Sequence, residues 1–118
     1  MPGDSIVDVD VRSLAERLQA NPALVILDVR EPYEVRYARL PHPQVCYAPL
    51  SQLAQQGAAA LPAPAQDQQA EILVICHHGI RSTQVTAWLR ASGWQNAANL
   101  RGGIEAYAAL VDASVGRY

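Results

Sequence analysis

The residues from Ile72 to Ser82, I-L-V-I-C-H-H-G-I-R-S, constrain the fold more than any other stretch of the chain. A short aliphatic run, typical of a buried strand, ends at Cys76, and a helical pattern begins around Ser82. These residues predict a strand, a tight loop and a helix. At such a strand end, the backbone N–H groups and the dipole of the following helix favour a thiolate over a thiol. We therefore interpret Cys76 as a nucleophile.

The loop after Cys76 carries two further residues that suit an anion. Gly79 can adopt backbone angles that are closed to other residues, so successive amides can point inward as a nest. Arg81 adds a permanent positive charge at the far rim of this loop. Residues 76–82 are therefore predicted to form an anion-holding active loop.

The order of strand and helix repeats along the chain. The continuous apolar run from Leu24 to Val29 fits a strand buried on both faces. Shorter strands are predicted over residues 5–9, 45–48 and within 94–100, and helices over 10–21, between 31 and 40, over 51–57 and 82–92, and from 103 onward. Strands that alternate with helices predict one α/β domain, with a mostly parallel sheet and helices on both faces.

Single residues mark the predicted ends and faces of the helices. Ser51 is predicted to cap the third helix. Trp88 lies at helical spacing and is interpreted as a core residue rather than a binding aromatic. In the final helix, Ile104, Tyr107 and Leu110 are predicted to share the buried side.

Two segments show no apolar period. Residues 57–70 contain two prolines and are interpreted as a mobile surface connection. Residues 112–118 form a C-terminal tail, which the sequence leaves open as a flexible segment or a partner contact.

Ligands of parallel sheets bind at the carboxyl ends of the strands, so Cys76, Arg30 and the Gly102-Gly103 turn are expected on one rim. Asp28 and Arg30 end their strand, and two interpretations stay open: an ion pair that braces the rim, or a substrate-binding Arg30. Gly102 and Gly103 are expected to permit close backbone approach beneath the active loop.

The composition of the chain limits the classes of ligand and partner that it can have. A chain of 118 residues, half of them apolar, fits a single domain with one core. The net charge is −2, and the nine basic residues are all arginines without a cluster, which argues against nucleic acid as a ligand. No apolar run approaches the roughly 20 residues of a membrane span, and residues 1–10 lack the pattern of a secretion signal. We expect a cytoplasmic protein, monomeric by default.

The remaining cysteine and the histidines have simple interpretations. Two cysteines cannot build a disulfide framework, and Cys46, without a charge or glycine pattern beside it, is interpreted as a small buried hydrophobe. Cys76, His77 and His78 are adjacent and cannot all face one ion, so no metal is predicted. His77 and His78 are left open as solvent-facing residues or as groups that recognise a donor or acceptor.

Three blocks of the sequence resemble one family. The runs L-D-V-R-E-P-Y-E (27–34), C-H-H-G-I-R-S (76–82) and N-L-R-G-G-I-E-A-Y (99–107) are similar to the signature blocks of single-domain rhodanese-like sulfurtransferases, in the same order and spacing. Together they span nearly the whole chain. The second block and the ending A-Y-x-x-x-V-D-x-S-V also resemble rhodanese-like proteins of photosynthetic lineages.

The resemblance implies a five-stranded parallel sheet and a sulfurtransferase in which Cys76 carries a persulfide. The persulfide and the substrate would be surrounded by the loop residues His77, His78, Gly79, Ile80, Arg81 and Ser82, with Arg30 nearby. Asp28, Gly102 and Gly103 would support them. The donor would be a thiosulfate-, mercaptopyruvate- or persulfide-like molecule and the acceptor a thiol or cyanide, with no cofactor beyond the persulfide.

The sequence departs from this family at three places. Ala38 to Pro43 replaces the usual glycine-histidine-isoleucine stretch and proline-glycine-alanine turn, and Tyr107 replaces a tryptophan. The loop has His77 and His78 where thiosulfate-using members carry basic residues, and Arg81 where they carry a small hydroxyl residue. Thiosulfate is therefore not implied as the physiological donor.

Two other functions remain as alternatives. Many rhodanese-like modules serve as docking or regulatory domains without catalysis, although those often lack the cysteine that this chain retains. A cysteine-based phosphatase or arsenate reductase would place five residues between cysteine and arginine, where this chain has four, residues 77–80. The shorter loop makes a smaller cradle, which suits a single sulfur atom better than an oxyanion.

Overall fold

Five parallel strands form the centre of the molecule. The computed structural model describes residues 7–118. The strands are β1 (Asp8–Val9), β2 (Val25–Asp28), β3 (Val45–Tyr47), β4 (Ile72–Ile75) and β5 (Ala97–Leu100). They pair in the order β1-β5-β4-β2-β3, and each pair is parallel. The predicted α/β class and the five-stranded parallel sheet are confirmed, and β4, which leads into Cys76, is the central strand.

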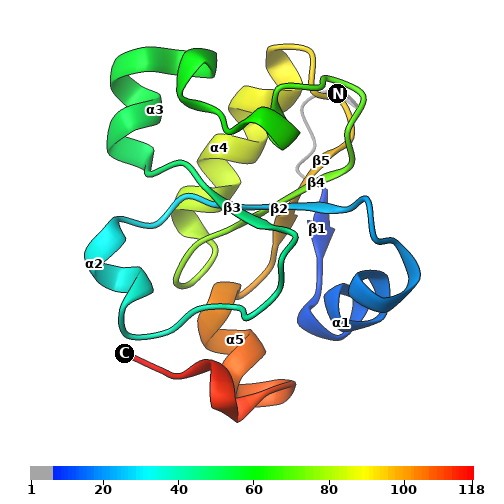
Figure 1. The fold of residues 1–118 in the computed structure, drawn as a ribbon, viewed down its shortest axis with the longest axis vertical. Coiled ribbons are helices and arrows are strands. Elements are labelled where there is room, and N and C mark those ends of the chain that lie inside the picture. Colours follow the sequence, from blue (N-terminus) through cyan, green and yellow to red (C-terminus); the bar gives the residue numbers. More distant parts are fainter. Residues whose placement is uncertain (1–6) are drawn as a thin grey trace.

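Helices cover both faces of the sheet (Figure 1). The helices are α1 (Val11–Ala20), α2 (Pro32–Val35), α3 (Leu50–Gln56), α4 (Ile80–Ala91) and α5 (Gly103–Leu110). The first and last pack together on one face, while α3 and α4 lie on the other. No helix within residues 7–118 has both the length and the apolar character that crossing a membrane requires.

The alternation of side chains along β4 decides which face receives Cys76. Leu73 and Ile75 join the core beneath α1 and α5. Ile72, Val74 and Cys76 join the core beneath α3 and α4. Because successive side chains of a strand point to opposite faces, Cys76 is directed toward α4, the helix that follows it in the chain.

The predicted cap at Ser51 is wrong. The helix α3 begins at Leu50 with Pro49 in the N-cap position, so Ser51 lies inside its first turn. The Ser51 hydroxyl instead donates a hydrogen bond to Glu31 Oε1, at 2.8 Å. Proline in front of the helix fixes a φ angle of −53°, and the helix starts without a side-chain cap.

Leu110 does not belong to the buried side of α5. It is 56% exposed, whereas Ile104, Tyr107 and Ala108 are buried. Each helical residue turns by about 100°, so Leu110, six positions after Ile104, lies about 120° around the helix from it. The burial of Ile104 and Tyr107 is confirmed, and Trp88 is half-buried against the core on the α4 side.

Residues 57–70 pack against the domain rather than forming a surface connection throughout. They contain two 3₁₀ turns, Gly57–Ala60 and Ala63–Ala65, and both Leu61 and Ala65 are buried. The Trp94 indole donates a hydrogen bond to the Ala65 carbonyl, at 2.9 Å. The 3₁₀ turns repeat every three residues, so the 3.6-residue period of an α-helix does not reveal them.

The two ends of the chain differ from the predicted elements in other ways. The first strand comprises Asp8–Val9, and residues 5 and 6 of the predicted strand lie outside the described residues. The tail 112–118 packs against the domain, since Val115 is buried and accepts a hydrogen bond from Arg39 N–H at 3.2 Å.

We expect Leu89→Ala to lower the free energy of unfolding by about 2–5 kcal/mol, because Leu89 is fully buried between α4 and the sheet and its loss leaves a cavity. The matched control Leu110→Ala should change it by less than about 0.5 kcal/mol, because that side chain is exposed. Chemical denaturation of both variants measures the difference. Equal losses would contradict the assignment of Leu110 to the surface.

Candidate active site

The Cys76 sulfur lies at the centre of a loop of hydrogen-bond donors. The Gly79 and Ser82 backbone N–H groups donate to Sγ at 3.1 and 3.3 Å, and the Ser82 hydroxyl oxygen lies 3.2 Å from it. Because α4 begins at Ile80, two residues earlier than predicted, the Ser82 amide belongs to its first turn and the positive end of the helix dipole faces the sulfur. The predicted convergence of loop amides on Cys76 is present.

The loop can take this shape because it lies directly on the start of α5. The Cys76 and His77 carbonyls accept hydrogen bonds from the N–H groups of Ile104 and Glu105, at 2.9 and 3.1 Å. A Cβ atom at Gly103 would lie 2.4 Å from the His77 carbonyl oxygen and 2.5 Å from that of Cys76. Only a glycine fits, as the expected close approach of the backbone requires.

Arg81 does not face the sulfur as a free cation. Its guanidinium makes a two-point contact with the Glu34 carboxylate, at 2.6 and 2.7 Å. The Glu34 side chain is 6% exposed and that of Arg81 30%. The hydrogen bonds from Arg81 lower the pKa of Glu34 from 4.5 to about 2, and those same bonds raise the pKa of Arg81. The loop is thereby tied to α2.

Arg30 is buried completely and braces the rim. Its guanidinium contacts the Asp28 carboxylate at 2.8 Å and donates to the hydroxyl of Tyr118 at 3.1 Å. Burial alone would lower its pKa, but the contacts with Asp28 outweigh burial and raise it. The predicted Asp28–Arg30 ion pair is present, and in this conformation Arg30 has no surface to offer a substrate.

The histidines of the loop take part in a stack of aromatic rings. The His77 ring lies between the rings of His78 and Tyr118, with centroids 3.9 and 3.8 Å away. Burial, and then the proximity of His78, lower the pKa of His77 and so favour its uncharged form. The Tyr118 hydroxyl donates to Glu34 Oε1 at 3.0 Å, which links the tail to the Arg81 ion pair. His77 is therefore not a plain solvent-facing residue, whereas His78 is exposed.

Cys46 lies half-buried on β3, at the edge of the sheet. Burial, together with the nearby Asp28 carboxylate, raises the pKa of its thiol to about 11. This keeps Cys46 protonated, as expected for a packing residue. Within residues 7–118, no cluster of three or more histidine, cysteine, aspartate or glutamate side chains has the arrangement of a metal site.

Sequence reasoning did not single out Glu34, Asn99 or Tyr118, which all reach the site. Glu34 forms a capping box with Glu31, a pattern that is visible in the sequence but points to a helix start. Asn99 is a polar residue inside an apolar strand, and that anomaly was the available signal. Tyr118 carries no local signal, because its hydrogen bonds reach residues more than 80 positions away.

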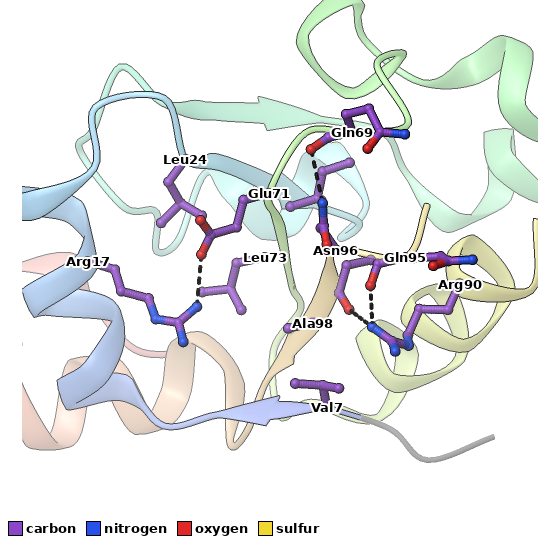
Figure 2. A pocket seen from close by; sticks show the side chains of 12 residues that line it. Val7, Arg17, Leu24, Gln69, Glu71, Leu73, Arg90, Gln95, Asn96 and Ala98 are labelled. Carbon is purple, nitrogen blue, oxygen red and sulfur yellow. Dashed lines mark hydrogen bonds and ion pairs between the residues drawn. The ribbon is translucent and has the colours of Figure 1, made fainter. Parts of the chain in front are cut away.

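A pocket of about 500 Å³ lies away from this site, at the amino ends of β2, β4 and β5 (Figure 2). Its charged groups are bound within the fold. Arg17 pairs with Glu71 at 3.0 Å, and Arg90 donates to the carbonyls of Gln95 and Ala97. A smaller pocket of about 460 Å³ borders the active loop and is lined by His78, Gly79, Asp8 and Asn99, among others.

The parallel sheet, with a cysteine-bearing loop at the carboxyl end of its central strand, defines a class of α/β domain, and comparisons with known proteins agree. The sequence profile described as rhodanese-like domain matches residues 10–110. The chloroplastic rhodanese-like/PpiC domain-containing protein 12 of Arabidopsis thaliana is 33% identical over 120 residues, which cover 98% of this chain and 38% of that protein. A sulfurtransferase of Allochromatium vinosum is 29% identical over 101 residues, 86% of this chain and 87% of that protein.

A solved structure supports the same relationship. A rhodanese-related protein from Thermoplasma volcanium superposes with a TM-score of 0.71 at 26% identity, over 87% of this chain and 91% of that one. The chain belongs to the rhodanese-like domain family. It spans about two fifths of the Arabidopsis relative and most of the Allochromatium one.

We expect Gly103→Ala to disrupt the active loop, because its new Cβ would collide with two loop carbonyls. Gly57→Ala is a matched control: Gly57 also has a positive φ, +59° against +64°, but a Cβ there meets no atom within 4 Å. The control should lose about 1–3 kcal/mol of stability from backbone strain alone. Gly103→Ala should lose more, and should alone change the rate at which Cys76 is alkylated. Equal behaviour of the two variants would refute the collision.

The Glu34–Arg81 pair should make stability depend on pH. A carboxylate with a lowered pKa stabilises the fold above its ordinary value of 4.5, and this contribution is lost as the pH falls to about 2. Glu34→Gln should therefore cost about 1–3 kcal/mol near pH 7, and the difference from wild type should shrink between pH 4.5 and 2. Urea titrations at each pH measure it. Glu16→Gln, at an exposed position, is the control and should show no such trend.

Proposed function

We propose that this protein is a sulfurtransferase that carries a sulfane sulfur on Cys76. In the first half-reaction the Cys76 thiolate attacks the outer sulfur of the donor. A Cys76 S–S bond forms, the bond from that sulfur to the donor breaks, and the donor leaves as an anion such as a thiolate or sulfite. In the second, a thiolate or cyanide attacks the outer sulfur, the S–S bond breaks and the Cys76 thiolate is restored.

The arrangement of donors around Cys76 carries the proposal. Two backbone N–H groups donate to the sulfur, that of Gly79 from the loop and that of Ser82 from the first turn of α4. Fixed dipoles of this kind stabilise a sulfur anion without reorganising during the reaction. Membership of the rhodanese-like family and the name of the Allochromatium relative support the same chemistry.

The position of Arg81 argues against the phosphatase alternative. A cysteine-based phosphatase needs its loop arginine on the oxygens of the bound oxyanion. Here the Arg81 guanidinium is engaged by Glu34 at 2.6 and 2.7 Å. Turning it inward would leave the Glu34 carboxylate, which is 6% exposed, without its partner. A loop with four residues between Cys76 and Arg81 suits sulfur better.

The ion pairs around the loop also affect which sulfur donor the site favours. Arg81 is neutralised by Glu34 and Arg30 by Asp28, and burial lowers the pKa of His77, which disfavours a positive charge there. A strongly hydrated dianion such as thiosulfate would therefore find paired rather than open side-chain charges at the loop. We expect a low-molecular-weight persulfide to load Cys76 faster than thiosulfate does.

Intact-mass spectrometry tests the proposal. Incubation with glutathione persulfide should add one sulfur atom to the protein, and cyanide or a thiol should remove it. Cys76→Ser should gain no sulfur because it lacks the nucleophile. The matched control Cys46→Ser should load like wild type, because the Cys46 thiol stays protonated with a pKa of about 11. Loading by thiosulfate, followed in parallel, should be slower.

Two outcomes would replace the proposal. If neither donor nor mercaptopyruvate adds sulfur, the protein is a docking module, and a partner should then co-purify equally with wild type and Cys76→Ser. If the protein releases phosphate from an aryl phosphate and Cys76→Ser does not, the phosphatase assignment is correct.

A further inference from the structure

A buried chain of hydrogen bonds runs from the active-loop sulfur to the edge strand of the sheet. The Ser82 Oγ lies 3.2 Å from Cys76 Sγ and donates to Asn99 Oδ1 at 2.5 Å. The Asn99 Nδ2 group donates to Asp8 Oδ1 at 3.0 Å. Cys76, Ser82 and Asn99 are each 3% exposed or less. The hydrogen bonds that the Gly79 and Ser82 backbone N–H groups donate to Cys76 are separate from this series of side-chain hydrogen bonds.

The pairing of the strands brings the side chains of this hydrogen-bond chain together. Asp8 on β1 and Asn99 on β5 are register partners in neighbouring parallel strands, so their side chains stand side by side. Ser82 comes from the first turn of α4, which packs on the same part of β5. Asp8 is exposed and lines the pocket beside the loop.

The carboxylate at the far end gives the chain a direction. A carboxylate only accepts hydrogen bonds, so the NH₂ group of Asn99 must face Asp8 and its oxygen must face Ser82. Ser82 has one hydroxyl proton, and it is given to Asn99. The Ser82 oxygen therefore turns a lone pair toward Cys76, where it can accept from a thiol but repels a thiolate.

We propose that Asn99, oriented by Asp8, is a positioning residue that fixes the direction of the Ser82 hydroxyl and so restrains Cys76 in the thiol form between turnovers. A thiolate recruits this hydroxyl as a third donor only when the Ser82–Asn99 bond breaks, which strands the buried Asn99 oxygen. The inference rests on the proposed role of Cys76 as the nucleophile. On this inference, the contact between Asp8 on β1 and Asn99 on β5 keeps Cys76 protonated between turnovers.

Other charges near the loop do not give this directional effect. Arg81 is paired with Glu34, and His77 lies 4.0 Å from Glu105. Asp28 is paired with Arg30, and His78 is exposed. None of these groups is hydrogen-bonded to the Ser82 or Asn99 side chain in the part of the chain that the structure describes.

A double-mutant cycle separates direction from charge. Asp8→Asn replaces the fixed acceptor with an amide, so Asn99 can turn its NH₂ to Ser82 and release the hydroxyl for the sulfur. In a Cys46→Ser background, where Cys76 is the single thiol, iodoacetamide alkylation is followed against pH. Asp8→Asn should move the curve to lower pH by about one unit, because the thiolate gains about one hydrogen bond. On the rising part of the curve this shift corresponds to a roughly tenfold faster alkylation.

Ser82→Ala is the matched background, because it removes the hydroxyl and keeps any effect of the lost Asp8 charge. There, Asp8→Asn should shift the curve by a much smaller amount. Equal shifts in both backgrounds would reduce the effect to charge and overturn the inference, as would no shift or a shift to higher pH. If Ser82→Ala does not fold by circular dichroism, Asn99→Ala supplies the same comparison, because without the Asn99 side chain the charge of Asp8 remains but cannot orient the Ser82 hydroxyl. Alkylation needs no sulfur donor, so this result is independent of whether a persulfide forms.

Discussion

The structure depends on the contact between the active loop and the start of α5. The loop carbonyls of Cys76 and His77 accept hydrogen bonds from the first amides of α5, and that leaves the N–H groups of Gly79 and Ser82 free to point the other way, at the sulfur. A peptide chain cannot aim several amides inward unless its carbonyls are satisfied outside. Gly103 makes this possible, because any side chain there would push the two backbones apart.

Around this contact, charged side chains form ion pairs with one another and are not left open to a ligand. Glu34 is the centre of one network, since it binds Arg81 from the loop and the hydroxyl of Tyr118 from the tail. The guanidinium of Arg30 joins Asp28 to the same tyrosine. These contacts tie α2, the loop and the tail together at the carboxyl edge of the sheet. In the proposed sulfur transfer, stabilisation of the sulfur anion is thereby left to backbone dipoles, which suits an atom that would gain and lose charge in each half-reaction.

Much of the fold was readable because it follows from local patterns. Apolar runs bounded by helical segments predicted the parallel sheet, and the strand before Cys76 placed this cysteine at its carboxyl end. The failures have physical causes. Ser51 looked like a cap but Pro49 takes that position, Leu110 lies on the exposed side of a short helix, and Leu61 and Ala65 are buried by 3₁₀ turns that have no 3.6-residue period.

The sequence by itself determined the class of fold, the place of Cys76 at the end of a buried strand, the four-residue spacing to Arg81 and the need for glycine beneath the loop. Each of these depends on residues that are close in the chain or on backbone geometry that a residue type imposes. Only the tertiary structure decided what the polar side chains do. Arg81 pairs with a residue 47 positions away, and Asn99 joins Asp8, 91 positions away, to the active loop. Partners this distant are chosen by the packing of β1, β5, α2 and α4 around one strand end, and no local pattern encodes that choice.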